Sequence, residues 1–194
     1  MNLDGRKVLL RAIEEDDLEM LRDMANDSEI ERLVCGFSYP VSKYQQRKWF
    51  EEVSNDKQNV RYVIETKEDG AVGFASIMAI NWKNSTCLVG LKLCNKNLKS
   101  KGIGSDTVMT IMRYIFDELQ LNRAGVNIIE YNVASMNLFY NKLGWKQEGI
   151  KRQFIFNNGK YHNLMEYGFL KNEYYELVNR IHYWTEEDET KIIF

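Results

Sequence analysis

The stretch NLKSKGIGS, from Asn97 to Ser105, constrains the fold of this chain more than any other segment. The apolar segment TCLVGLKLC precedes it, and the amphipathic segment DTVMTIMRYIFDEL follows it. A strand, a glycine-containing loop and a helix in this order are typical of a strand–helix–strand unit, whose two strands lie parallel in one sheet. We therefore predict that the segments Thr86–Cys94 and Arg123–Tyr131 form a parallel pair of strands.

Hydrophobic periodicity predicts the other elements. Alternating or continuous apolar runs predict strands at Lys7–Ile13, Val60–Thr66, Ala71–Ile80, Thr86–Cys94, Arg123–Tyr131, Trp145–Phe156 and Lys160–Leu170. Helical spacing of apolar residues predicts helices at 18–25, 27–34, 44–53 and 106–119, and a short helix over MNLFYNKL that is capped by Ser135 and ended by Gly144. The segments Glu68–Gly70 and Asn157–Gly159 are typical of tight hairpin turns. The order of these elements predicts a mixed α/β domain rather than a regular βαβ repeat.

Length and composition predict a single globular domain. The chain has 194 residues, of which 44% are hydrophobic, and no Pro/Gly/Ser-rich linker divides it. We assign residues 1–182 to the domain and 183–194 to an acidic C-terminal tail. The net charge of −2 argues against nucleic acid as a partner. Since the sequence has neither a signal peptide nor a run of about 18 apolar residues, we expect a soluble cytoplasmic protein with no membrane association.

The cysteines and histidines do not indicate a metal centre. The three cysteines, Cys35, Cys87 and Cys94, form no CxxC pair, and only two histidines accompany them. This spacing matches no common zinc site, so we predict no metal. We interpret each cysteine as a small buried apolar residue.

The loop before the helix has the features of a phosphate site. The first N–H groups of a helix lack internal partners, and the helix dipole leaves that end partly positive. Gly102 and Gly104 allow the backbone to turn and to approach an anion closely. Lys96, Lys99 and Lys101 add positive charge. These features together suit a pyrophosphate group.

Three classes of phosphate-binding loop compete for this segment. A Walker A loop requires GxxxxGK[ST], which is absent. A dinucleotide fingerprint requires GxGxxG, but Gly102 and Gly104 are followed by Ser105, Asp106 and Thr107, so the third glycine is missing. That fingerprint also usually opens the first βαβ unit, whereas this loop lies past the middle of the chain. The third class is a coenzyme A loop.

The chain resembles the GNAT superfamily of acetyl-CoA-dependent N-acetyltransferases. Lys99-x-x-Gly102-x-Gly104 is similar to the family signature (Gln/Arg/Lys)-x-x-Gly-x-(Gly/Ala), and Asn132–Trp145 resembles the segment N-x-x-S-x-x-(L/F)-Y-x-K-L-G-F. The opening LLRAIEEDD and the closing EGIKRQFIFNNGKYHNLMEYGFLKNEY resemble the branch of ribosomal-protein N-terminal and spermidine N-acetyltransferases. The resemblance covers nearly the whole chain. It implies an α/β fold with a single mixed, mostly antiparallel sheet flanked by helices.

The resemblance also implies a set of site residues. The residues expected to bind acetyl-CoA are Lys92, Leu93, Cys94, Lys99, Ser100, Lys101, Gly102, Ile103, Gly104, Ser105, Asn132 and Asn137. Amides of the first three would hold the pantetheine arm and polarise the thioester carbonyl, which is an oxyanion-type role. Tyr140 would donate its phenolic proton to the departing thiolate as a general acid, although it could also be a packing aromatic. Leu143, Gly144 and Trp145 are interpreted as structural.

One departure from the family pattern concerns the general base. Many relatives carry a glutamate in the fourth strand, but the segment Cys87–Leu91 contains no acid. An unperturbed primary amine is almost wholly protonated at neutral pH, so its proton needs another route. Glu130 and Glu166 are candidate bases. Without a base, a non-catalytic acyl-CoA-binding module is an alternative.

The implied reaction is transfer of an acetyl group from acetyl-CoA to a primary amine. We take a protein N-terminus as the first acceptor, and a polyamine, a nucleotide-linked aminosugar or an aminoglycoside as alternatives. The aromatic residues that could line an acceptor groove are Phe37, Tyr39, Trp49 and Trp82. The acids that could attract a polycation are Glu29, Glu31, Glu51 and Glu52. The expected partners are acetyl-CoA, a small-molecule or peptide amine and, in a homodimer, a second copy of the chain.

Overall fold

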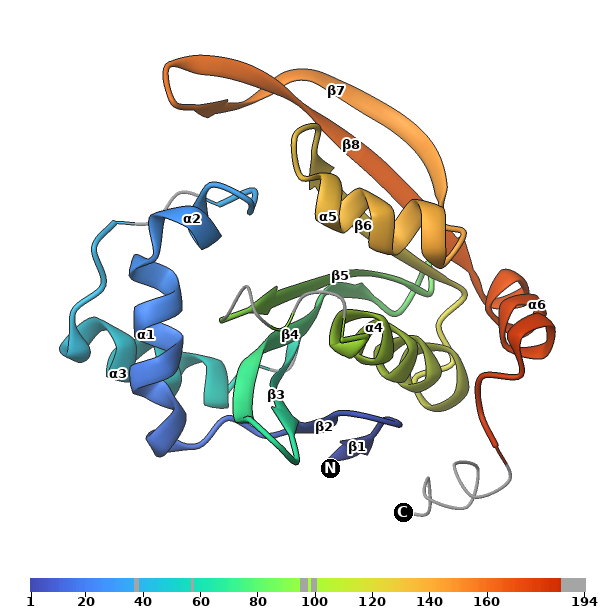
Figure 1. Cartoon of the computed structure of the whole chain (residues 1–194), viewed down its shortest axis with the longest axis horizontal. Coiled ribbons are helices and arrows are strands. Elements are labelled where there is room, and N and C mark those ends of the chain that lie inside the picture. Colours follow the sequence, from blue (N-terminus) through green and yellow to red (C-terminus); the bar gives the residue numbers. More distant parts are fainter. Residues whose placement is uncertain (37–38, 57, 95–97, 99–100, 186–194) are drawn as a thin grey trace.

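An eight-stranded mixed sheet forms the centre of the fold. The computed structural model describes residues 1–36, 39–56, 58–94, 98 and 101–185. The strands are β1 (Leu3–Asp4), β2 (Leu9–Arg11), β3 (Val60–Thr66), β4 (Gly70–Asn81), β5 (Thr86–Leu93), β6 (Arg123–Ile129), β7 (Lys146–Asn157) and β8 (Lys160–Leu170). They lie in the order β1-β2-β3-β4-β5-β6-β8-β7 (Figure 1). Each neighbouring pair is antiparallel except β5 and β6, which are parallel. This confirms the mixed, mostly antiparallel sheet and the parallel pair.

Helices flank the sheet. They are the 3₁₀ turn η1 (Glu15–Asp17), α1 (Leu18–Asn26), α2 (Ser28–Glu31), α3 (Lys43–Ser54), α4 (Ile103–Arg113) with the π-helical turn η3 (Tyr114–Glu118), α5 (Val133–Met136) with the π-helical turn η4 (Asn137–Lys142), and α6 (Lys171–Ile181). Figure 1 shows α1 and α3 together at one end of the sheet and α6 at the other, with α4 and α5 between them. The β7–β8 hairpin extends beyond the rest of the sheet (Figure 1).

Two elements differ from the prediction at the ends of the domain. The strand expected at Lys7–Ile13 is present but shorter, as β2, and it pairs with the unpredicted strand β1. The bond from Gly5 N to Val8 O, 2.8 Å long, closes the turn between them. The helix α6 was not predicted at all. Its signals are local: the Glu173 carboxylate accepts a bond from the N–H of Leu170, and the residues buried three positions apart are Tyr174 and Leu177.

The helix after β6 starts earlier than predicted. Its N-cap is Asn132 rather than Ser135, because the Asn132 Oδ1 atom accepts the N–H of Ser135 at 3.1 Å. Asparagine and serine are both good N-caps, so the sequence alone does not decide between these two positions. Gly144 follows the helix with a φ of +76°, as predicted for its end.

The helix α4 is buried around almost its whole circumference. Its apolar residues join the core, as the periodicity predicts, but five polar ones are also buried: Ser105, Asp106, Thr107, Thr110 and Arg113. The β1–β2 turn and the residues after α6 cover the polar side. The Arg113 guanidinium lies 4.6 Å from the centre of the Trp184 ring, and the Tyr183 hydroxyl donates to Asp106 at 2.7 Å. The packing of the domain therefore continues through Trp184, two residues past the boundary at 182.

One carboxylate connects three distant parts of the chain. The Asp106 side chain, only 1% exposed, accepts the N–H groups of Arg6, Lys7 and Val8 at 3.1, 2.6 and 3.0 Å, besides the hydroxyl of Tyr183. The turn approaches so closely that a Cβ on Gly5 would lie 2.6 Å from Asp106 Oδ2. A buried carboxylate is stable only when its lone pairs are satisfied, and here main-chain donors satisfy them.

Replacement of Asp106 by asparagine should destabilise the fold. The amide NH₂ would face a main-chain N–H, so at least one buried donor would lose its acceptor. We expect the free energy of unfolding to fall by about 2–4 kcal/mol in urea denaturation. The exposed Asp16→Asn is the matched control and should change it by less than about 0.5 kcal/mol. An Asp106→Asn protein as stable as the parent would contradict this role.

Candidate active site

The strands β5 and β6 separate after a short paired segment. Their register runs from Thr86 opposite Arg123 to Leu88 opposite Gly125, while β5 continues to Leu93 and β6 to Ile129. Within the described residues, no pairing joins the two strands beyond that point. The main-chain groups in this part of β5 that face away from β4 therefore have no strand partner. They are available to bind an extended ligand.

The main-chain direction of β5 selects among the predicted amides. The N–H of Cys94 donates to Val72 O at 2.9 Å, which places it on the β4 side. Because successive residues of an antiparallel strand face alternate neighbours, Lys92 also faces β4, whereas Leu93 and Leu91 face β6. Of the three amides implied by the resemblance, Leu93 therefore faces the diverging strands and Cys94 is used within the sheet. Leu91 was not among the predicted residues, because only the direction of its main chain within the folded strand indicates that it faces β6.

The glycine loop ends at the N-terminus of α4. Lys99 and Ser100 lie outside the described residues. Gly102 is the N-cap, with φ of +85°, a left-handed conformation that other residues rarely adopt. No side chain caps the helix, and its first main-chain bond is from Asp106 N to Gly102 O at 3.0 Å. Within the described residues, nothing accepts the N–H groups of the three positions between them, Ile103 to Ser105. These donors fit an anion.

The two sequence motifs meet at the start of α4. A Cβ atom on Gly104 would lie 3.4 Å from Leu138 Cδ2, so the turn η4 lies against the helix N-terminus. Tyr140 follows two residues later in η4, with 52% of its surface exposed, and its ring centre lies 5.9 Å from that of Tyr167. Burial raises the pKa of Tyr167, and the neighbouring Tyr140 raises it further. Tyr167 was not among the predicted site residues.

The π-helical turn η4 accounts for an extra residue in the second motif. Between its serine and its tyrosine, this chain has one residue more than the family pattern. The bond from Leu143 N to Leu138 O, 3.1 Å long, spans five residues and gives the extra one room. Counted from Ser135, the family tyrosine corresponds to Phe139, which is 2% exposed and packs against Trp145. The insertion leaves Tyr140 as the residue with an accessible hydroxyl.

Both predicted asparagines make contacts within the protein. Besides its cap bond, Asn132 donates from Nδ2 to Leu33 O at 2.9 Å. The Oδ1 atom of Asn137 accepts a bond from Asn141 Nδ2 at 2.6 Å. Asn132 therefore joins the α2 region to the end of β6, and its predicted contact with coenzyme remains a prediction.

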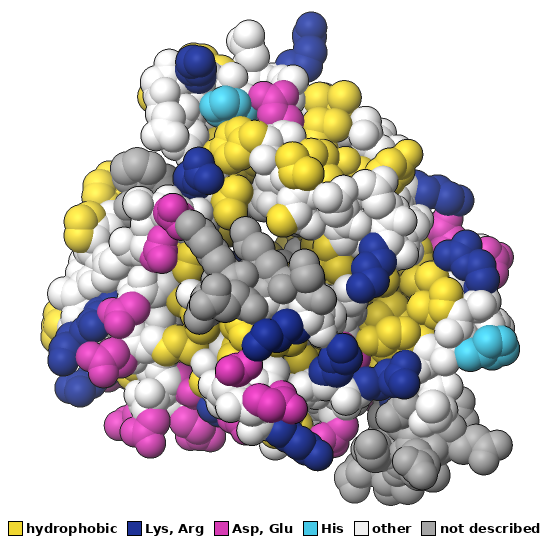
Figure 2. Space-filling view, in the orientation of Figure 1, with side chains coloured by type: hydrophobic (Ala, Val, Ile, Leu, Met, Phe, Trp, Pro, Cys, Tyr) yellow, Lys and Arg dark blue, Asp and Glu magenta, His cyan; other side chains and the backbone are white. Residues whose placement is uncertain are grey.

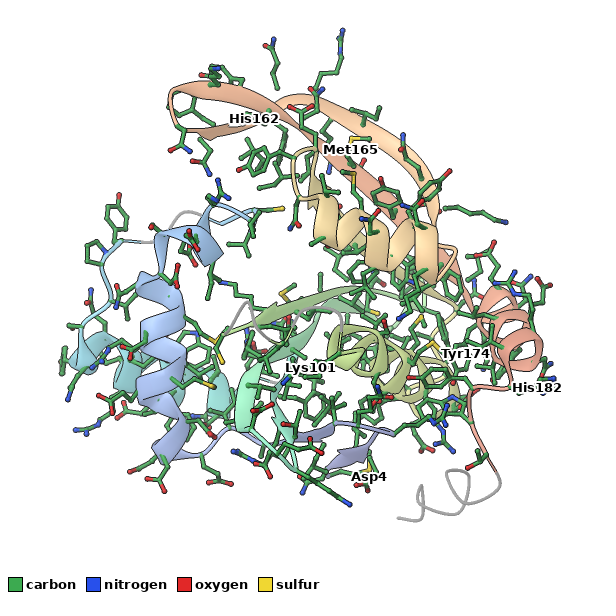
Figure 3. The ribbon with its side chains drawn as sticks, viewed as in Figure 1. Asp4, Lys101, His162, Met165, Tyr174 and His182 are labelled. Carbon is green, nitrogen blue, oxygen red and sulfur yellow. The ribbon has the colours of Figure 1, made fainter. Side chains whose placement is uncertain are left out.

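The two candidate bases are each paired. Glu130 Oε1 lies 3.3 Å from His162 Nδ1, and Glu166 Oε1 lies 2.7 Å from Lys151 Nζ. His162 belongs to the β7–β8 hairpin, well away from Lys101 at the start of α4 (Figure 3). Both carboxylates therefore already have a side-chain partner.

Residues 31–33 contact both of the separated strands or the residues that follow them. Lys92 Nζ on β5 lies 3.1 Å from the Glu31 carboxylate. Just after β6, the Tyr131 hydroxyl donates to Arg32 O at 2.5 Å, and Asn157 Nδ2 lies 3.0 Å from that hydroxyl. These contacts join residues from 26 to 99 positions apart, so no local pattern could have predicted them.

The aromatic residues predicted to line an acceptor groove have mixed outcomes. Trp49 packs against Phe74 at 6.2 Å between ring centres, while Tyr39 and Trp82 are exposed; Phe37 lies outside the described residues. Figure 2 shows hydrophobic side chains at the surface among charged ones. The β7–β8 hairpin also carries exposed aromatic side chains: Phe154, Phe156 and Tyr161.

Only one cysteine is fully buried. Burial raises the pKa of the Cys87 thiol to about 12, so this thiol is protonated at neutral pH. Cys94 is partly buried, but Cys35 is exposed, with its sulfur 3.7 Å from Asn127 O. The prediction that all three are buried is therefore wrong for Cys35, because the segment after α2 lies at the surface.

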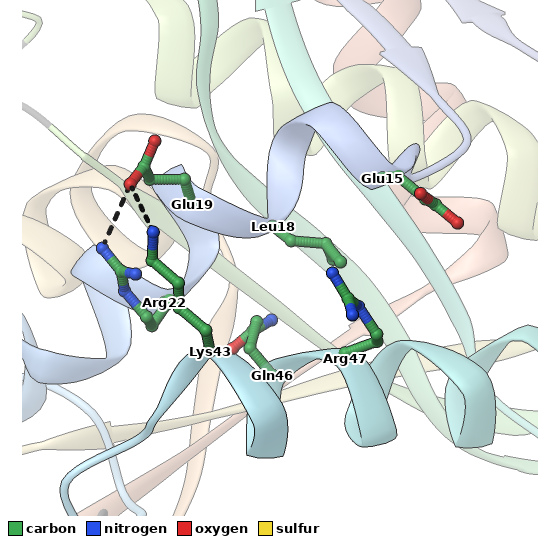
Figure 4. A pocket seen from close by; sticks show the side chains of 7 residues that line it. All are labelled: Glu15, Leu18, Glu19, Arg22, Lys43, Gln46 and Arg47. Atoms are coloured by element: carbon green, nitrogen blue, oxygen red, sulfur yellow. Dashed lines mark hydrogen bonds and ion pairs between the residues drawn. The ribbon is translucent and has the colours of Figure 1, made fainter.

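A depression of about 160 Å³ lies elsewhere, between α1 and α3 (Figure 4). Its lining is Glu15, Leu18, Glu19, Arg22, Lys43, Gln46 and Arg47. None of these residues belongs to either motif, and acids and bases are mixed: Glu19 lies within 4 Å of both Arg22 and Lys43. Size alone does not make it the active site.

The described part of the chain has neither a metal-binding cluster nor a membrane-spanning helix. It contains no group of three or more His, Cys, Asp or Glu side chains arranged to hold a metal ion. None of its helices combines the length and the apolar character that crossing a bilayer requires.

Comparison with known proteins identifies the family. The sequence model of the acetyltransferase (GNAT) domain matches residues 7–146. An uncharacterized N-acetyltransferase of Bacillus subtilis, derived from the SPbeta prophage, is 26% identical over 170 residues, which are 88% of this chain and 93% of that protein. The spermidine N(1)-acetyltransferase of Vibrio cholerae is 22% identical over 172 residues, covering 87% and 95%. A putative ribosomal N-acetyltransferase of B. subtilis is 29% identical over 107 residues, covering 55% and 57%.

Solved structures agree with this fold. The crystal structure of spermidine N-acetyltransferase from V. cholerae, in complex with CoA and spermine, superposes with a TM-score of 0.80 at 21% identity, covering 87% of this chain and 98% of that one. A probable acetyltransferase superposes with a TM-score of 0.75 at 22% identity, covering 89% and 98%. The matched domain includes both motifs, the separated strands and the free N-terminus of α4. The chain belongs to the GNAT acetyltransferase family and is an acetyl-CoA-dependent N-acetyltransferase.

Proposed function

We propose that the acceptor is the α-amino group of a protein N-terminus, which attacks acetyl-CoA directly in a ternary complex. The observation that carries this proposal is the lack of an acid on β5, together with the pairing of Glu130 and Glu166. An α-amino group has a pKa near 8, so roughly one in ten is neutral at pH 7 without any base. A lysine-like amine has a pKa of about 10.4, and only about one in 2,500 is neutral.

Charges beside the separated strands support the same acceptor class. A polyamine carries several positive charges and is best held by carboxylates that have no other partner. Here the Glu31 carboxylate pairs with Lys92, Glu130 with His162 and Glu166 with Lys151. A polycation would have to displace these partners, whereas a peptide brings only one ammonium group.

The coenzyme is proposed to lie between the start of α4 and β5. The N–H groups of residues 103–105 bind its diphosphate, and the left-handed Gly102 keeps the approach free of a side chain. The pantetheine arm then runs along β5, where main-chain groups of Leu93 and Leu91 face it and polarise the thioester carbonyl. The turn η4 borders this site, because Leu138 contacts the same helix start.

Tyr140 is proposed as the general acid. The neutral amine nitrogen attacks the thioester carbonyl carbon, and the resulting tetrahedral intermediate breaks its C–S bond. The departing thiolate takes the phenolic proton of Tyr140, and the amine loses its proton to solvent. The half-exposed Tyr140 beside the buried Tyr167 can regain a proton from water for the next cycle.

A polyamine acceptor is the second candidate, since the similar protein from V. cholerae is named for spermidine both as a sequence and as a solved structure. An acceptor panel with a thiol-release assay separates the two. We expect the kcat/KM of a peptide with a free N-terminus to exceed that of spermidine and to rise with pH until about pH 8, where the α-amine becomes neutral. The same peptide with a blocked N-terminus and one internal lysine is the matched control. A higher kcat/KM for spermidine would overturn the proposed acceptor.

Gly102→Glu should abolish coenzyme A binding. The new side chain is strained at a φ of +85° and places bulk and negative charge against the diphosphate. Isothermal titration with coenzyme A measures the loss. Gly159→Glu introduces the same charge at a φ of +75° in the β7–β8 turn, and should bind normally. Retained affinity in Gly102→Glu would remove the diphosphate from this loop.

Tyr140→Phe should lower turnover and leave coenzyme affinity nearly unchanged. Loss of the proton donor is expected to reduce kcat about 100-fold, within the usual range for general-acid groups. Tyr161→Phe, at another exposed tyrosine on the hairpin, is the control and should keep full activity. Unchanged kcat in Tyr140→Phe would assign that side chain to packing.

A further inference from the structure

The turn between β1 and β2 lies over the start of α4. Three consecutive N–H groups, those of residues 6–8, donate to the carboxylate of Asp106 in the first turn of that helix. Gly5 approaches the same carboxylate so closely that it leaves no space for a side chain. The position of the turn relative to the helix N-terminus is therefore fixed by main-chain N–H groups that bind one buried carboxylate, rather than by exposed, flexible side chains.

This arrangement brings the Lys7 ammonium to the helix N-cap. Lys7 Nζ donates to Lys101 O at 2.9 Å, and a Cβ on Gly102 would lie 3.1 Å from Nζ. The neighbouring Arg6 points elsewhere, with its guanidinium 5.4 Å from the centre of the Tyr183 ring. An ammonium has three N–H donors, and the carbonyl of Lys101 takes one, so donors remain for a further acceptor.

The Lys7 ammonium adds positive charge at the positive end of the helix. The N-terminus of a helix is its positive end, where an anion is stabilised and a cation is not. Lys101 contributes a second positive charge, and its own ion pair with Asp69 is 3.6 Å long and exposed. The Asp106 carboxylate beneath the turn is already bound by three amides and a hydroxyl. The Lys7 ammonium therefore lies beside the N-cap of α4, next to the main-chain donors of residues 103–105.

We propose that Lys7 is a further coenzyme-binding residue, whose ammonium binds an oxygen of the diphosphate together with the N–H groups at the start of α4. The inference rests on the proposed placement of the diphosphate at residues 101–105. It adds a ligand from the N-terminal part of the chain, 94 positions before Lys101 in the sequence. Lys7 thereby makes affinity depend on the first strands as well as on the glycine loop.

A comparison of three ligands with four proteins tests this. The ligands are coenzyme A, dephospho-coenzyme A, which keeps the diphosphate but lacks the 3′-phosphate, and pantetheine, which lacks all phosphates. The proteins are the parent, Lys7→Gln, Lys7→Arg and Lys83→Gln, the last being an exposed lysine in the β4–β5 turn. NMR titration measures even weak dissociation constants, and urea denaturation checks that each protein is folded.

The expected result is specific to the diphosphate. Lys7→Gln should weaken coenzyme A and dephospho-coenzyme A equally, by about five- to tenfold, and change pantetheine affinity by less than about twofold. Lys7→Arg should restore much of the loss, because it keeps the charge. Lys83→Gln should match the parent with all three ligands.

Other outcomes overturn distinct parts of the argument. Equal weakening of pantetheine would make Lys7 a structural residue, and weakening of coenzyme A alone would assign the ammonium to the 3′-phosphate. If the parent prefers coenzyme A to pantetheine and Lys7→Gln keeps that preference in full, only the inference about Lys7 fails. If the parent itself shows no such preference, the proposed diphosphate site fails as well.

Discussion

The buried carboxylate of Asp106 is the interaction on which the rest of the structure depends. It accepts four hydrogen bonds, from three amides of the β1–β2 turn and from the hydroxyl of Tyr183. The first strands and the segment after α6 are thereby both attached to the first turn of α4. This attachment covers the side of the helix, while within the described residues the first main-chain N–H groups of the helix have no acceptor. The same contact also sets the position of Lys7.

The separation of β5 from β6 supplies the second half of the site. Parallel strands that remain paired use all their main-chain groups in the sheet, whereas these two pair over only three positions. The groups released on β5 face the gap toward β6, and the turn η4 that follows β6 lies against the start of α4 through Leu138 and Gly104. Anion binding and thioester polarisation can thus both rely on main-chain donors, which need no ionisable side chain.

The route of the amine proton links the missing acid to the acceptor. With Glu130 and Glu166 both paired, the chain offers no evident replacement among the described residues for an acid on β5. An amine that is partly neutral by itself needs no such group, and α-amino groups meet this condition far better than polyamines do. The α-amino acceptor that we propose and the residues of the enzyme are therefore complementary.

The sequence alone determined the local features: the strands and hairpin turns, the glycine loop before α4, and the motif that contains Tyr140, because each depends on residues close together in the chain. Even α6 had local signals in Glu173 and Tyr174. Only the tertiary structure decided which amides of β5 are available, that the extra residue before Tyr140 is taken up by a π-helical turn, and that Lys7 lies beside Gly102. These features depend on strand direction and on contacts between residues nearly 100 positions apart, which no periodicity or short motif encodes.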